Sequence, residues 1–412
     1  MFKDNYLDMN KIITDKAVLQ LFEVVEKHGG IIRFVGGAVR DALAGLKGFD
    51  LDLATDMTPD ELVEVCEENE IKTIPIGIKF GTVGVVINDK VLEVTSLRKD
   101  IETDGRHAKV EFTTDWQEDA SRRDLTINAV YADEKGNVFD YYNGIDDLEK
   151  GIVRFIGNPN LRIQEDYLRI LRFFRFYAIF GKGEIDAKAL AACKANHAGL
   201  MKISIERIRD EFFKILLTPH AIRSVKIMLE HDILGYILPS APHFDYLQNL
   251  ITLVRQENLE ESALRRLFIL YTPDEKLADN FASRLKLSRK QKDLFMSWAK
   301  YNYELSNFTD SKCLAKMLYE HDREFCHHKF ILTCAIQGEK PEEFHNILQQ
   351  IENIPIHEFP LKGRDLILAG IKDNRKIGQI LKMLEHLWIE SNFQMNKNDL
   401  LSQVHINLQL AQ

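Results

Sequence analysis

The feature that most constrains the fold of this chain is a change of sequence pattern near residue 160. Before it, short runs rich in β-branched residues alternate with helical segments, as in IIRFV (31–35), GTVGVVI (81–87) and VLEVTSL (91–97). After it, strand signals fade, and amphipathic segments of roughly 10–20 residues follow one another to the end. The pattern predicts an α+β head with a mixed set of strands, followed by a long all-α portion.

Local signals give the expected elements. FDLDLA (49–54) predicts a strand, and Asn88-Asp89-Lys90 predicts a hairpin turn between two strands. Helical spacing covers 38–45 and 58–70, the second with Thr58 as its N-cap and Pro59 at its first helical position. Further helices are expected at 165–180, 204–217, 219–231, 262–270, 289–304, 311–320 and 374–390.

Composition excludes several classes of protein. The chain has 412 residues, 45% of them hydrophobic and 28% charged, which is typical of a soluble globular protein with more than one domain. Five scattered cysteines without a CxxC pair predict neither a disulfide framework nor a Cys-rich zinc site, and they suit a reducing cytoplasm. No apolar run reaches the ~18 residues of a membrane span. The charged N-terminal segment is not a signal peptide.

The first segment that carries chemistry is VGGAVRDALAGLKGFDLDLATD (35–56). Gly36 and Gly37 lie where a strand ends and a helix begins, so backbone N–H groups can approach a ligand such as a triphosphate. Arg40, one turn later, offers a charged contact to the same ligand. Taken alone, the two glycines could equally form a tight turn with no role in ligand binding.

Acidic residues on two strands suggest a metal site. Asp50 and Asp52 are separated by one residue, so both carboxylates project from one face of the strand. A hard divalent cation such as Mg²⁺ would relieve their repulsion; an N-cap and a solvated edge residue are the alternative. Glu93 lies in VLEVTSL and is a candidate third catalytic carboxylate, because two-metal nucleotidyl transfer commonly uses three. An exposed edge-strand glutamate is the alternative there.

Two further segments combine arginines with acids. In DASRRDLTINAV (119–130), Asp124 and Asn128 are four apart and are expected on one helical face, next to Arg123, as a polar network. In QEDYLRILRFFRFYAIF (164–180), one helix is expected to carry a polar stripe along an otherwise apolar surface. The members of the stripe are Asp166, Arg169, Arg172 and Arg175.

The stripe contains the groups needed to recognise a base. Asp166 supplies an acceptor and Arg169 supplies planar donors, which together match the Watson–Crick edge of a nucleotide. A structural ion-pair network is the alternative for the stripe.

These segments together resemble one enzyme family. GGAVRD, DLDLATD, RRDLTINA and EDYLRILR, in this order and at these distances, resemble the class II tRNA nucleotidyltransferases, which are the bacterial-type CCA-adding enzymes and poly(A) polymerases of the polymerase-β-like superfamily. The matching region covers about residues 31–180, with weaker similarity over 200–217, 228–239 and 359–393. The resemblance implies a catalytic head (1–150), a neck that recognises the base (151–220), and an RNA-binding body (221–345) and tail (346–412).

The resemblance also implies roles for single residues. Mg²⁺ is expected on Asp50 and Asp52, and Glu165 is expected to orient an arginine. Asp166 and Arg169 are expected to pair with incoming CTP or ATP, in place of a nucleic-acid template. The triphosphate contacts are expected from Gly37, Arg40 and Arg123. Arg172 and Arg175 are expected to support both the base and the phosphates.

The implied reaction adds C, C and A to the 3′ end of tRNA and releases pyrophosphate. The partner is the tRNA acceptor end, and neither a membrane nor a stable protein partner is expected. Residues 151–220 hold 12 Lys/Arg against 7 Asp/Glu in a chain of net charge -9, which favours a local anionic partner. Further RNA backbone contacts are expected among Arg265, Arg266, Arg284, Lys286, Arg289, Lys290 and Lys292.

Other activities remain as alternatives. A poly(A) polymerase or a partial CC- or A-adding enzyme would share the head, and a non-catalytic RNA-binding module would not need two adjacent carboxylates. Two His-Asp dipeptides, His231-Asp232 and His321-Asp322, could suggest a metal phosphohydrolase. This activity is disfavoured, because no consistent set of further metal ligands surrounds them. The charged segment RKDIETDGRHAKVEFT (98–113) predicts a mobile loop, which in the resembling family helps the switch from CTP to ATP and favours full CCA addition.

Overall fold

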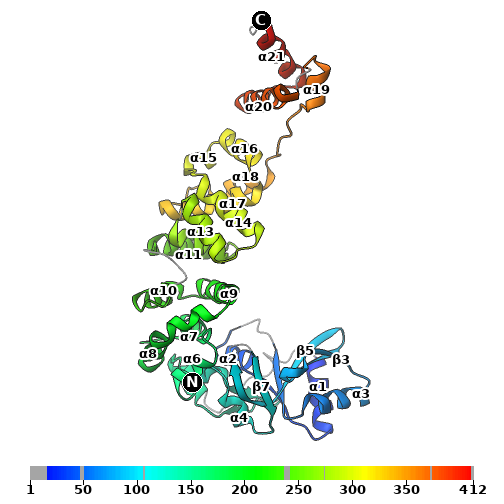
Figure 1. Ribbon diagram of the computed structural model, residues 1–412, viewed down its shortest axis with the longest axis vertical. Helices are drawn as coiled ribbons and strands as arrows, with labels where there is room; N and C mark the ends of the chain where they lie inside the picture. Colours follow the sequence, from blue (N-terminus) through cyan, green and yellow to red (C-terminus); the bar gives the residue numbers. More distant parts are fainter. Residues whose placement is uncertain are drawn as a thin grey trace. The chain divides into compact units, whose positions relative to one another are not determined.

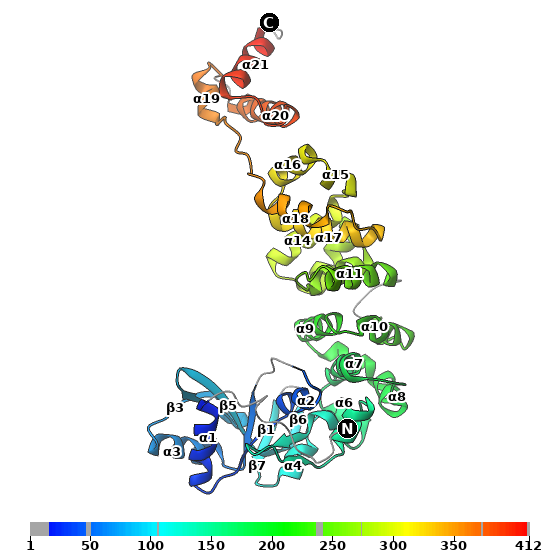
Figure 2. The same ribbon diagram turned by 180° about the vertical axis from the view of Figure 1, so that it is seen from behind.

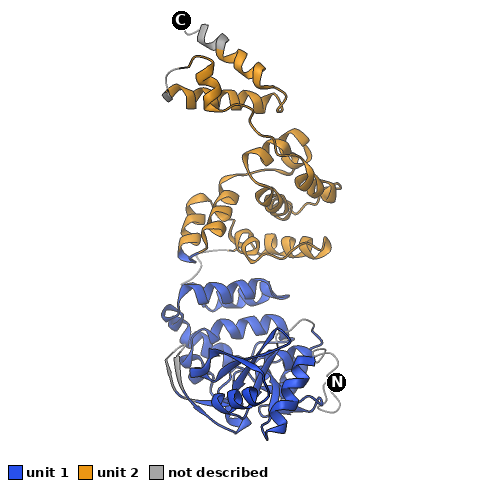
Figure 3. Ribbon diagram, turned by 90° about the vertical axis from the view of Figure 1, so that its right-hand side faces the viewer, with its two compact units in different colours: residues 1–240, 284–286 blue, residues 241–283, 287–412 orange. Residues whose placement is uncertain are grey.

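The computed structural model (Figure 1) describes residues 16–46, 51–104, 107–235, 242–272, 274–371 and 374–409. Within these residues all strands precede residue 141; they are coloured blue to cyan in Figure 1 and Figure 2. Every later element of the described chain is a helix. The chain divides into two compact units (Figure 3). The N-terminal unit comprises residues 1–240 and 284–286, and the C-terminal unit comprises 241–283 and 287–412. No described helix is long and apolar enough to cross a membrane.

A mixed sheet forms the base of the N-terminal unit. Its strands in the described residues are β1 (Ile32–Val35), β2 (Asp52–Thr55), β3 (Lys72–Gly77), β4 (Thr82–Ile87), β5 (Lys90–Ser96), β8 (Val130–Ala132) and β9 (Val138–Asp140). They follow the order β3-β4-β5-β2-β1-β8-β9. β2 and β5 pair in parallel, and their other sheet neighbours are antiparallel. The predicted mixed sheet is therefore confirmed.

Local signals position the strands and the first helices. Asn88 and Asp89 adopt φ of 51° and 62°, the left-handed pair of a tight hairpin turn between β4 and β5, as predicted. Thr58 caps its helix, because its hydroxyl accepts from the N–H of Glu61 and its own N–H donates to the Glu61 carboxylate at 2.8 Å. The helices beside the sheet are α1 (Lys16–Lys27), α2 (Gly37–Leu43), the 3-10 turn η2 (Ile78–Phe80) and α3 (Pro59–Glu68).

The expectation of a loop over residues 98–113 is wrong. β6 (Arg98–Asp104) and β7 (His107–Phe112) form a separate two-stranded antiparallel sheet. Opposite charges face each other across it: Lys99 pairs with Glu111, and their charged atoms lie 3.1 Å apart. The charges that made the segment look irregular therefore support strand pairing.

The continuous helix expected within 119–130 is also wrong. α4 (Trp116–Ser121) ends early, and a 3-10 turn, η3 (Thr126–Asn128), precedes β8. The helix stops where the two following arginines turn back to the buried Asp119, to which Arg122 and Arg123 donate at 2.7 and 3.0 Å. Burial of one carboxylate among several donors outweighs helix propensity here.

The single helix expected at 165–180 is two helices. α6 (Pro159–Glu165) and α7 (Arg169–Phe180) are separated by a break in which Asp166 is extended, with φ −154° and ψ 107°. The Asp166 carboxylate accepts from the N–H of Leu168 at 3.1 Å, a local side-chain bond that competes with the helix. Asp166 therefore precedes the arginine stripe instead of belonging to it.

Two later helices of the N-terminal unit, α9 (Ile205–Leu216) and α10 (Ala221–Glu230), pack against α7, whereas α8 (Ala187–Asn196) packs against α6 and α5 (Gly144–Lys150) against η3. Ser224 donates from its hydroxyl to the carbonyl of Phe174 at 2.9 Å, which joins α7 to the last helix of this group. The buried face of α7 is aromatic, and Phe173 stacks on Phe155 at 5.4 Å. The unit also contains the 3-10 turn η4 (His197–Lys202).

The described part of the C-terminal unit is entirely helical, as predicted. Two of its helices, α16 and α20 below, have the predicted bounds. Its helices are α11 (Phe244–Gln256), α12 (Ala263–Tyr271), α13 (Glu275–Arg284, ending at the boundary), α14 (Arg289–Lys300), α15 (Leu305–Thr309), α16 (Ser311–Glu320), α17 (Arg323–Gln337), α18 (Phe344–Asn353), α19 (Gly363–Leu368), α20 (Asn374–Glu390) and α21 (Lys397–Gln409). An aromatic cluster around Phe268, Phe295 and Trp298 forms one core. Trp388 packs with the leucines of residues 361–404 in another.

Candidate active site

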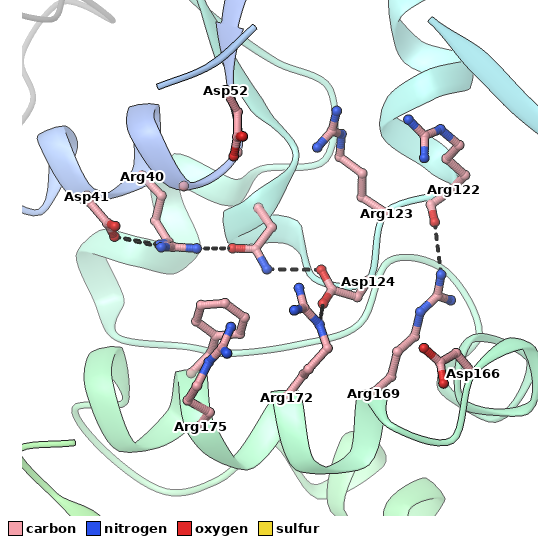
Figure 4. A pocket seen from close by; sticks show the side chains of 14 residues that line it. Arg40, Asp41, Asp52, Arg122, Arg123, Asp124, Asp166, Arg169, Arg172 and Arg175 are labelled. Atoms are coloured by element: carbon pink, nitrogen blue, oxygen red, sulfur yellow. Dashed lines mark hydrogen bonds and ion pairs between the residues drawn. The ribbon is translucent and has the colours of Figure 1, made fainter. Parts of the chain in front are cut away.

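An arginine-rich pocket of about 520 Å³ lies within the N-terminal unit (Figure 4). Its lining includes six arginines and four aspartates, so it carries a surplus of positive charge and attracts a polyanion. It is enclosed by α2, the start of β2, the segment before η3, and α7. The lining residues are Gly36, Gly37, Arg40, Asp41, Asp52, Arg122, Arg123, Asp124, Asn128, Asp166, Arg169, Arg172, Arg175 and Phe176.

The two glycines shape one edge of the pocket. Gly36 has φ 63°, a left-handed conformation that favours glycine, and a side chain there would start 3.5 Å from the Arg123 guanidinium. Arg40, on the helix that follows, is buried, and burial lowers the pKa of its guanidinium. Asp41 accepts from its Nε at 2.8 Å, which holds the guanidinium at the pocket wall.

A chain of hydrogen bonds crosses the pocket from α2 to α7 (Figure 4). Arg40 donates to the Asn128 side-chain oxygen, Asn128 donates to Asp124 at 2.9 Å, and Arg172 donates to Asp124 at 2.6 Å. Burial opposes ionisation of Asp124, but Arg172 and Asn128 outweigh it and hold its pKa well below the usual range. The sequence-predicted link between Asp124 and Asn128 is confirmed, although it does not lie on a regular helix.

The adjacent Arg122 and Arg123 share a buried partner. Asp119, 1% exposed, accepts from both arginines and from the Tyr131 hydroxyl at 2.7 Å. Burial would raise the pKa of Asp119, but Arg123 and Arg122 outweigh it and lower the pKa to about 2. Sequence reasoning did not single out Asp119, although its spacing of three and four residues before the arginines was the available signal.

The α7 arginines point into the pocket from the side opposite Asp52 (Figure 4). Arg175 lies 2.8 Å from a carboxylate oxygen of Glu211 on α9. The Phe176 ring packs beneath two guanidinium groups, 4.5 Å from that of Arg175 and 4.7 Å from that of Arg40. Glu211 and Phe176 extend the predicted stripe, and neither was identified from sequence as part of a site.

The predicted base-reading pair is also held in place. Arg207 on α9 donates to Asp166 at 2.8 Å. Arg169 donates to the Glu165 carboxylate and, at 3.2 Å, to the carbonyl of Arg122. Glu165 therefore contacts an arginine, as the sequence resemblance implies. The sequence gives no sign of Arg207, because the contact joins residues 41 positions apart.

The predicted metal ligands fall only partly within the described residues. Asp50 lies outside them. Asp52 is exposed and points into the pocket (Figure 4). Glu93 is the direct register partner of Asp52 on the parallel strand β5, so the two side chains project from the same face of the sheet, although Glu93 is not among the lining residues. The described part of the chain contains no group of three metal-ligating residues.

The pocket thus gathers most of the predicted site residues: Gly37, Arg40, Asp52, Arg123, Asp166, Arg169, Arg172 and Arg175. Comparisons with known proteins indicate the class of protein to which this chain belongs. Residues 32–154 match the family model described as the poly A polymerase head domain. Residues 184–244 match the model described as a probable RNA and SrmB-binding site of polymerase A. The fold and the pocket are those of a polymerase-β-like nucleotidyltransferase.

Whole-chain relatives narrow the class. The chain is 36% identical over 405 residues to the mitochondrial CCA tRNA nucleotidyltransferase 1 of Danio rerio, covering 96% of this chain and 91% of the relative. It is 32% identical over 383 residues to the CCA-adding enzyme of Ligilactobacillus salivarius, covering 90% and 91%. The chain belongs to the CCA tRNA nucleotidyltransferase family. The crystal structure of the Bacillus stearothermophilus CCA-adding enzyme with CTP matches with a TM-score of 0.79 at 25% identity, over 96% of this chain and 98% of that one.

Proposed function

We propose that this protein adds C, C and A to the 3′ end of tRNA from CTP and ATP, without a nucleic-acid template. The observation that carries the proposal is the meeting of Asp52, the cluster of arginines, and the pair Asp166 and Arg169 in one pocket. A nucleotidyl transfer needs all three: a carboxylate at the reacting phosphate, cations for the triphosphate, and groups that select the base.

The selection of C and A follows from hydrogen-bonding chemistry. Cytosine and adenine both present an amino donor next to an unprotonated ring nitrogen, whereas uracil and guanine present a carbonyl next to an N–H. A carboxylate that accepts beside a guanidinium that donates matches the first pattern and is mismatched with the second. In this proposal Asp166 accepts from the amino group and Arg169 donates to the ring nitrogen and, in cytosine, also to the adjacent carbonyl oxygen.

The contacts of the pair explain why its geometry is fixed before a nucleotide binds. Arg207 holds one carboxylate oxygen of Asp166, and the N–H of Leu168 holds the other. Glu165 and the carbonyl of Arg122 hold Arg169. Groups that are already oriented lose less conformational entropy when the base binds, so more of the hydrogen-bond energy serves selectivity.

The triphosphate is assigned to the other side of the pocket. Arg40, Arg123 and Arg172 each line it, together with Gly37, whose small size allows a phosphate to approach the backbone. Arg175 supports them from α7. Each of these arginines is anchored by an acid or an amide, which limits how far it can move toward the ligand.

Mg²⁺ is the proposed metal, and Asp50 and Asp52 would hold it. The register of Glu93 beside Asp52 supports Glu93 as a third carboxylate at the same face. When bound, the metal would stabilise charge on the triphosphate and favour ionisation of the tRNA 3′-hydroxyl. The chain's own part is to orient that hydroxyl and the α-phosphate, and to retain the pyrophosphate on the arginines until it leaves.

The proposed partner is the tRNA acceptor end, and the proposed compartment is the cytoplasm. The four-part division into head (1–150), neck (151–220), body (221–345) and tail (346–412) belongs to the same proposal. The surplus of Lys/Arg in 151–220, 12 against 7 Asp/Glu, supports an anionic ligand next to the pocket.

The test is incubation with a tRNA that ends at the discriminator base, with CTP alone, ATP alone or both, followed by sequencing of the products. The proposal expects CC with CTP alone and CCA with both nucleotides. Products that stop at CC with both nucleotides, or that carry a long A tail, would contradict it.

A further inference from the structure

A second polar cavity, of about 700 Å³, lies within the C-terminal unit and plays no part in the reaction above. The first turns of three helices, α12, α14 and α17, contribute to its lining, and these helices pack against one another. The lining residues are Glu260, Glu261, Ser262, Leu264, Arg265, Lys290, Gln291, Leu294, Trp298, Arg323, Glu324, His327, His328 and Glu352.

Three helix N-terminal turns contribute partial positive charge to the lining of the cavity. Each N-terminus carries a partial positive charge from its aligned peptide dipoles. Ser262, Ser288 and Asp322 cap these helices, each accepting from one backbone N–H in the first turn. The serine caps of α12 and α14 are neutral and leave the positive ends of these two helices in place, whereas the Asp322 carboxylate offsets that of α17.

Arg265 is the central observation. The sequence suggests an RNA contact on the surface, but this expectation is wrong, because Arg265 is 1% exposed. Its Nη2 donates to the carbonyl of Glu260, whereas its Nη1 has no hydrogen-bond partner, and no carboxylate lies within ion-pair distance among the described residues. Its neighbour Arg266 is also buried, but it pairs with Glu261 at 2.6 Å. A buried guanidinium stays charged, so its burial without an ion-pair partner is costly: desolvation lowers the pKa of Arg265, and the nearby Glu261 and Glu260 carboxylates offset this only in part.

Two further polar atoms at this cavity lack partners. Trp298 is 1% exposed and its indole N–H donates to nothing, while Lys329 fixes its backbone by donating to its carbonyl at 2.9 Å. The Nδ1 of His328 is also unpartnered, and its ring lies 5.3 Å from that of Trp298. Burial, with Arg265 nearby, lowers the pKa of His328 to about 3, so this imidazole is neutral at pH 7. The lining therefore holds unpartnered N–H groups of Arg265 and Trp298, and His328 adds a third donor in the tautomer that carries its proton on Nδ1.

The acids of the cavity lie at its mouth. Glu260, Glu261, Glu324 and Glu352 are all exposed, and Glu324 is paired with Lys290 at 2.8 Å. Exposed carboxylates are screened by solvent and salt, so they interact weakly with a small anion deep in the cavity. They oppose the approach of a long polyanion such as an RNA backbone, which would have to pass all four.

We propose that this cavity binds a small phosphate-type oxyanion, with the Nη1 of Arg265, the indole N–H of Trp298 and the Nδ1 of His328 as donors. The ligand is inorganic phosphate or the terminal phosphate of a small molecule. Each unpartnered atom of the inner wall then gains an acceptor, and the buried guanidinium gains its counter-charge.

The experiment uses Trp298 as its own probe. In the full-length chain carrying Trp116→Phe and Trp388→Phe, Trp298 is the only remaining tryptophan. Titration with inorganic phosphate, without nucleotide or divalent metal, should change its fluorescence saturably, with a Kd of about 1 mM or below. Arg265→Met should abolish the response. Arg123→Ala, in the catalytic pocket, should retain it.

The controls separate a small anion from an RNA backbone as the ligand. An equimolar tRNA transcript should leave the phosphate response unchanged; displacement of phosphate by tRNA would overturn the assignment to a small anion. Circular dichroism checks that Arg265→Met is folded. If it is not, Lys290→Ala at the exposed mouth decides instead, with an expected loss of affinity of up to about fivefold. No saturable change in the parent, or equal affinity in the decisive variant, would refute the proposal.

Discussion

The two polar pockets of this protein differ in how their arginines are neutralised. In the N-terminal unit the pocket arginines have acidic or amide partners, such as Asp124 for Arg172 and Glu211 for Arg175. In the C-terminal unit Arg265 is more deeply buried and has a backbone carbonyl as its hydrogen-bond partner. The first arrangement fixes cations that must be in position before a substrate arrives. The second leaves a charge for a ligand to neutralise.

The difference teaches that the number of positive charges alone does not define a binding site. A paired arginine has already lost its conformational freedom and much of its hydration, so it adds specificity at a modest gain in binding energy. An unpaired buried arginine destabilises the empty protein and gains most when a ligand binds. Four experiments test or refine this contrast, in order of expected effect.

We expect the largest effect on the rate of nucleotide incorporation, which should depend on the pocket in the N-terminal unit and not on the cavity in the C-terminal unit. Asp52→Ala, and equally Asp50→Ala, should lower CTP incorporation by on the order of 10³-fold, because a lost metal ligand removes several kcal/mol of transition-state stabilisation. Glu324→Ala at the second cavity should leave the rate unchanged. Single-turnover incorporation gives the rate, and filter binding checks that tRNA affinity is retained. Near-normal incorporation by either aspartate variant would refute the metal assignment.

The next effect concerns the hairpin β6–β7, which is joined to the catalytic pocket by the Arg122 Nε–H donating to the carbonyl of Arg98 at 3.0 Å. Replacing residues 100–110 with a short Gly-Ser turn should leave both C additions nearly intact. Addition of A should fall by about 100-fold, since small misplacements of catalytic groups cost that much. Product length at single-nucleotide resolution measures it. Completion of CCA at the parental rate would show that the hairpin does not control the switch.

Selectivity for CTP and ATP should fall when the base-reading groups are removed, and also when the residue that holds one of them in place is removed. Asp166→Ala or Arg169→Ala should increase UTP or GTP incorporation relative to CTP by about 10–100-fold, because one half of the hydrogen-bond pattern is gone. Arg207→Met should show part of the same defect by freeing Asp166, and Arg207→Lys should restore part of it. Competition between nucleotides at equal concentration measures selectivity. Unchanged selectivity in Arg207→Met would assign Arg207 a purely structural role.

The smallest effects are on the free energy of unfolding. Removing a charged partner near the N-terminal pocket should lower this free energy, whereas removing Arg265 in the C-terminal unit should leave it unchanged or raise it. The folded-state pKa of Asp119 is about 2, below its unfolded value, so its stabilisation is present above about pH 4 and is lost as the pH falls toward 2. Asp119→Asn should cost about 2–4 kcal/mol at pH 7, and this difference from the parent should shrink at low pH. Urea unfolding measures it, followed by the fluorescence of Trp116, which packs on Tyr131, in a chain that carries Trp298→Phe and Trp388→Phe.

Two controls complete the stability comparison. Asp146→Asn removes an exposed pair with Lys150 and should cost less than about 1 kcal/mol. Arg265→Met removes an unpaired buried charge and should be neutral or stabilising in the absence of phosphate. A loss above about 2 kcal/mol in Arg265→Met would indicate that its charge is already compensated in the empty protein.

Most of the fold follows from local sequence signals. The hairpin turn at Asn88 and Asp89 and the cap at Thr58 use residues adjacent in sequence, and both are confirmed. The errors arise where a single polar contact overrides a periodic pattern. The Asp166 side chain interrupts a helix that its apolar neighbours favour, and the pairing of β6 with β7, which includes the pair of Lys99 with Glu111, orders a segment whose composition resembles a loop.

The site residues that lie within contiguous sequence motifs could be predicted from the sequence. Eight of the predicted residues line one pocket because each motif contains its own spacing information. The contacts of Arg207 with Asp166 and of Glu211 with Arg175 depend on how α9 packs against α7. That packing is set by the burial of large apolar surfaces, which do not specify in the sequence which polar groups will meet. Arg265 shows the converse, since nothing in its charge reveals that its helix is buried.

The parallel pairing of β2 with β5 has a consequence for how this chain tolerates change in length. Asp52 and Glu93 are direct neighbours, although α3, β3 and β4 lie between them in the sequence. An insertion in the turns of that intervening segment would leave the two carboxylates together, because their register is set by the strands themselves. A single residue added within β5 before Glu93 would instead turn its carboxylate to the opposite face of the sheet. The turns of the intervening segment can therefore be lengthened, whereas β5 must keep its residue count.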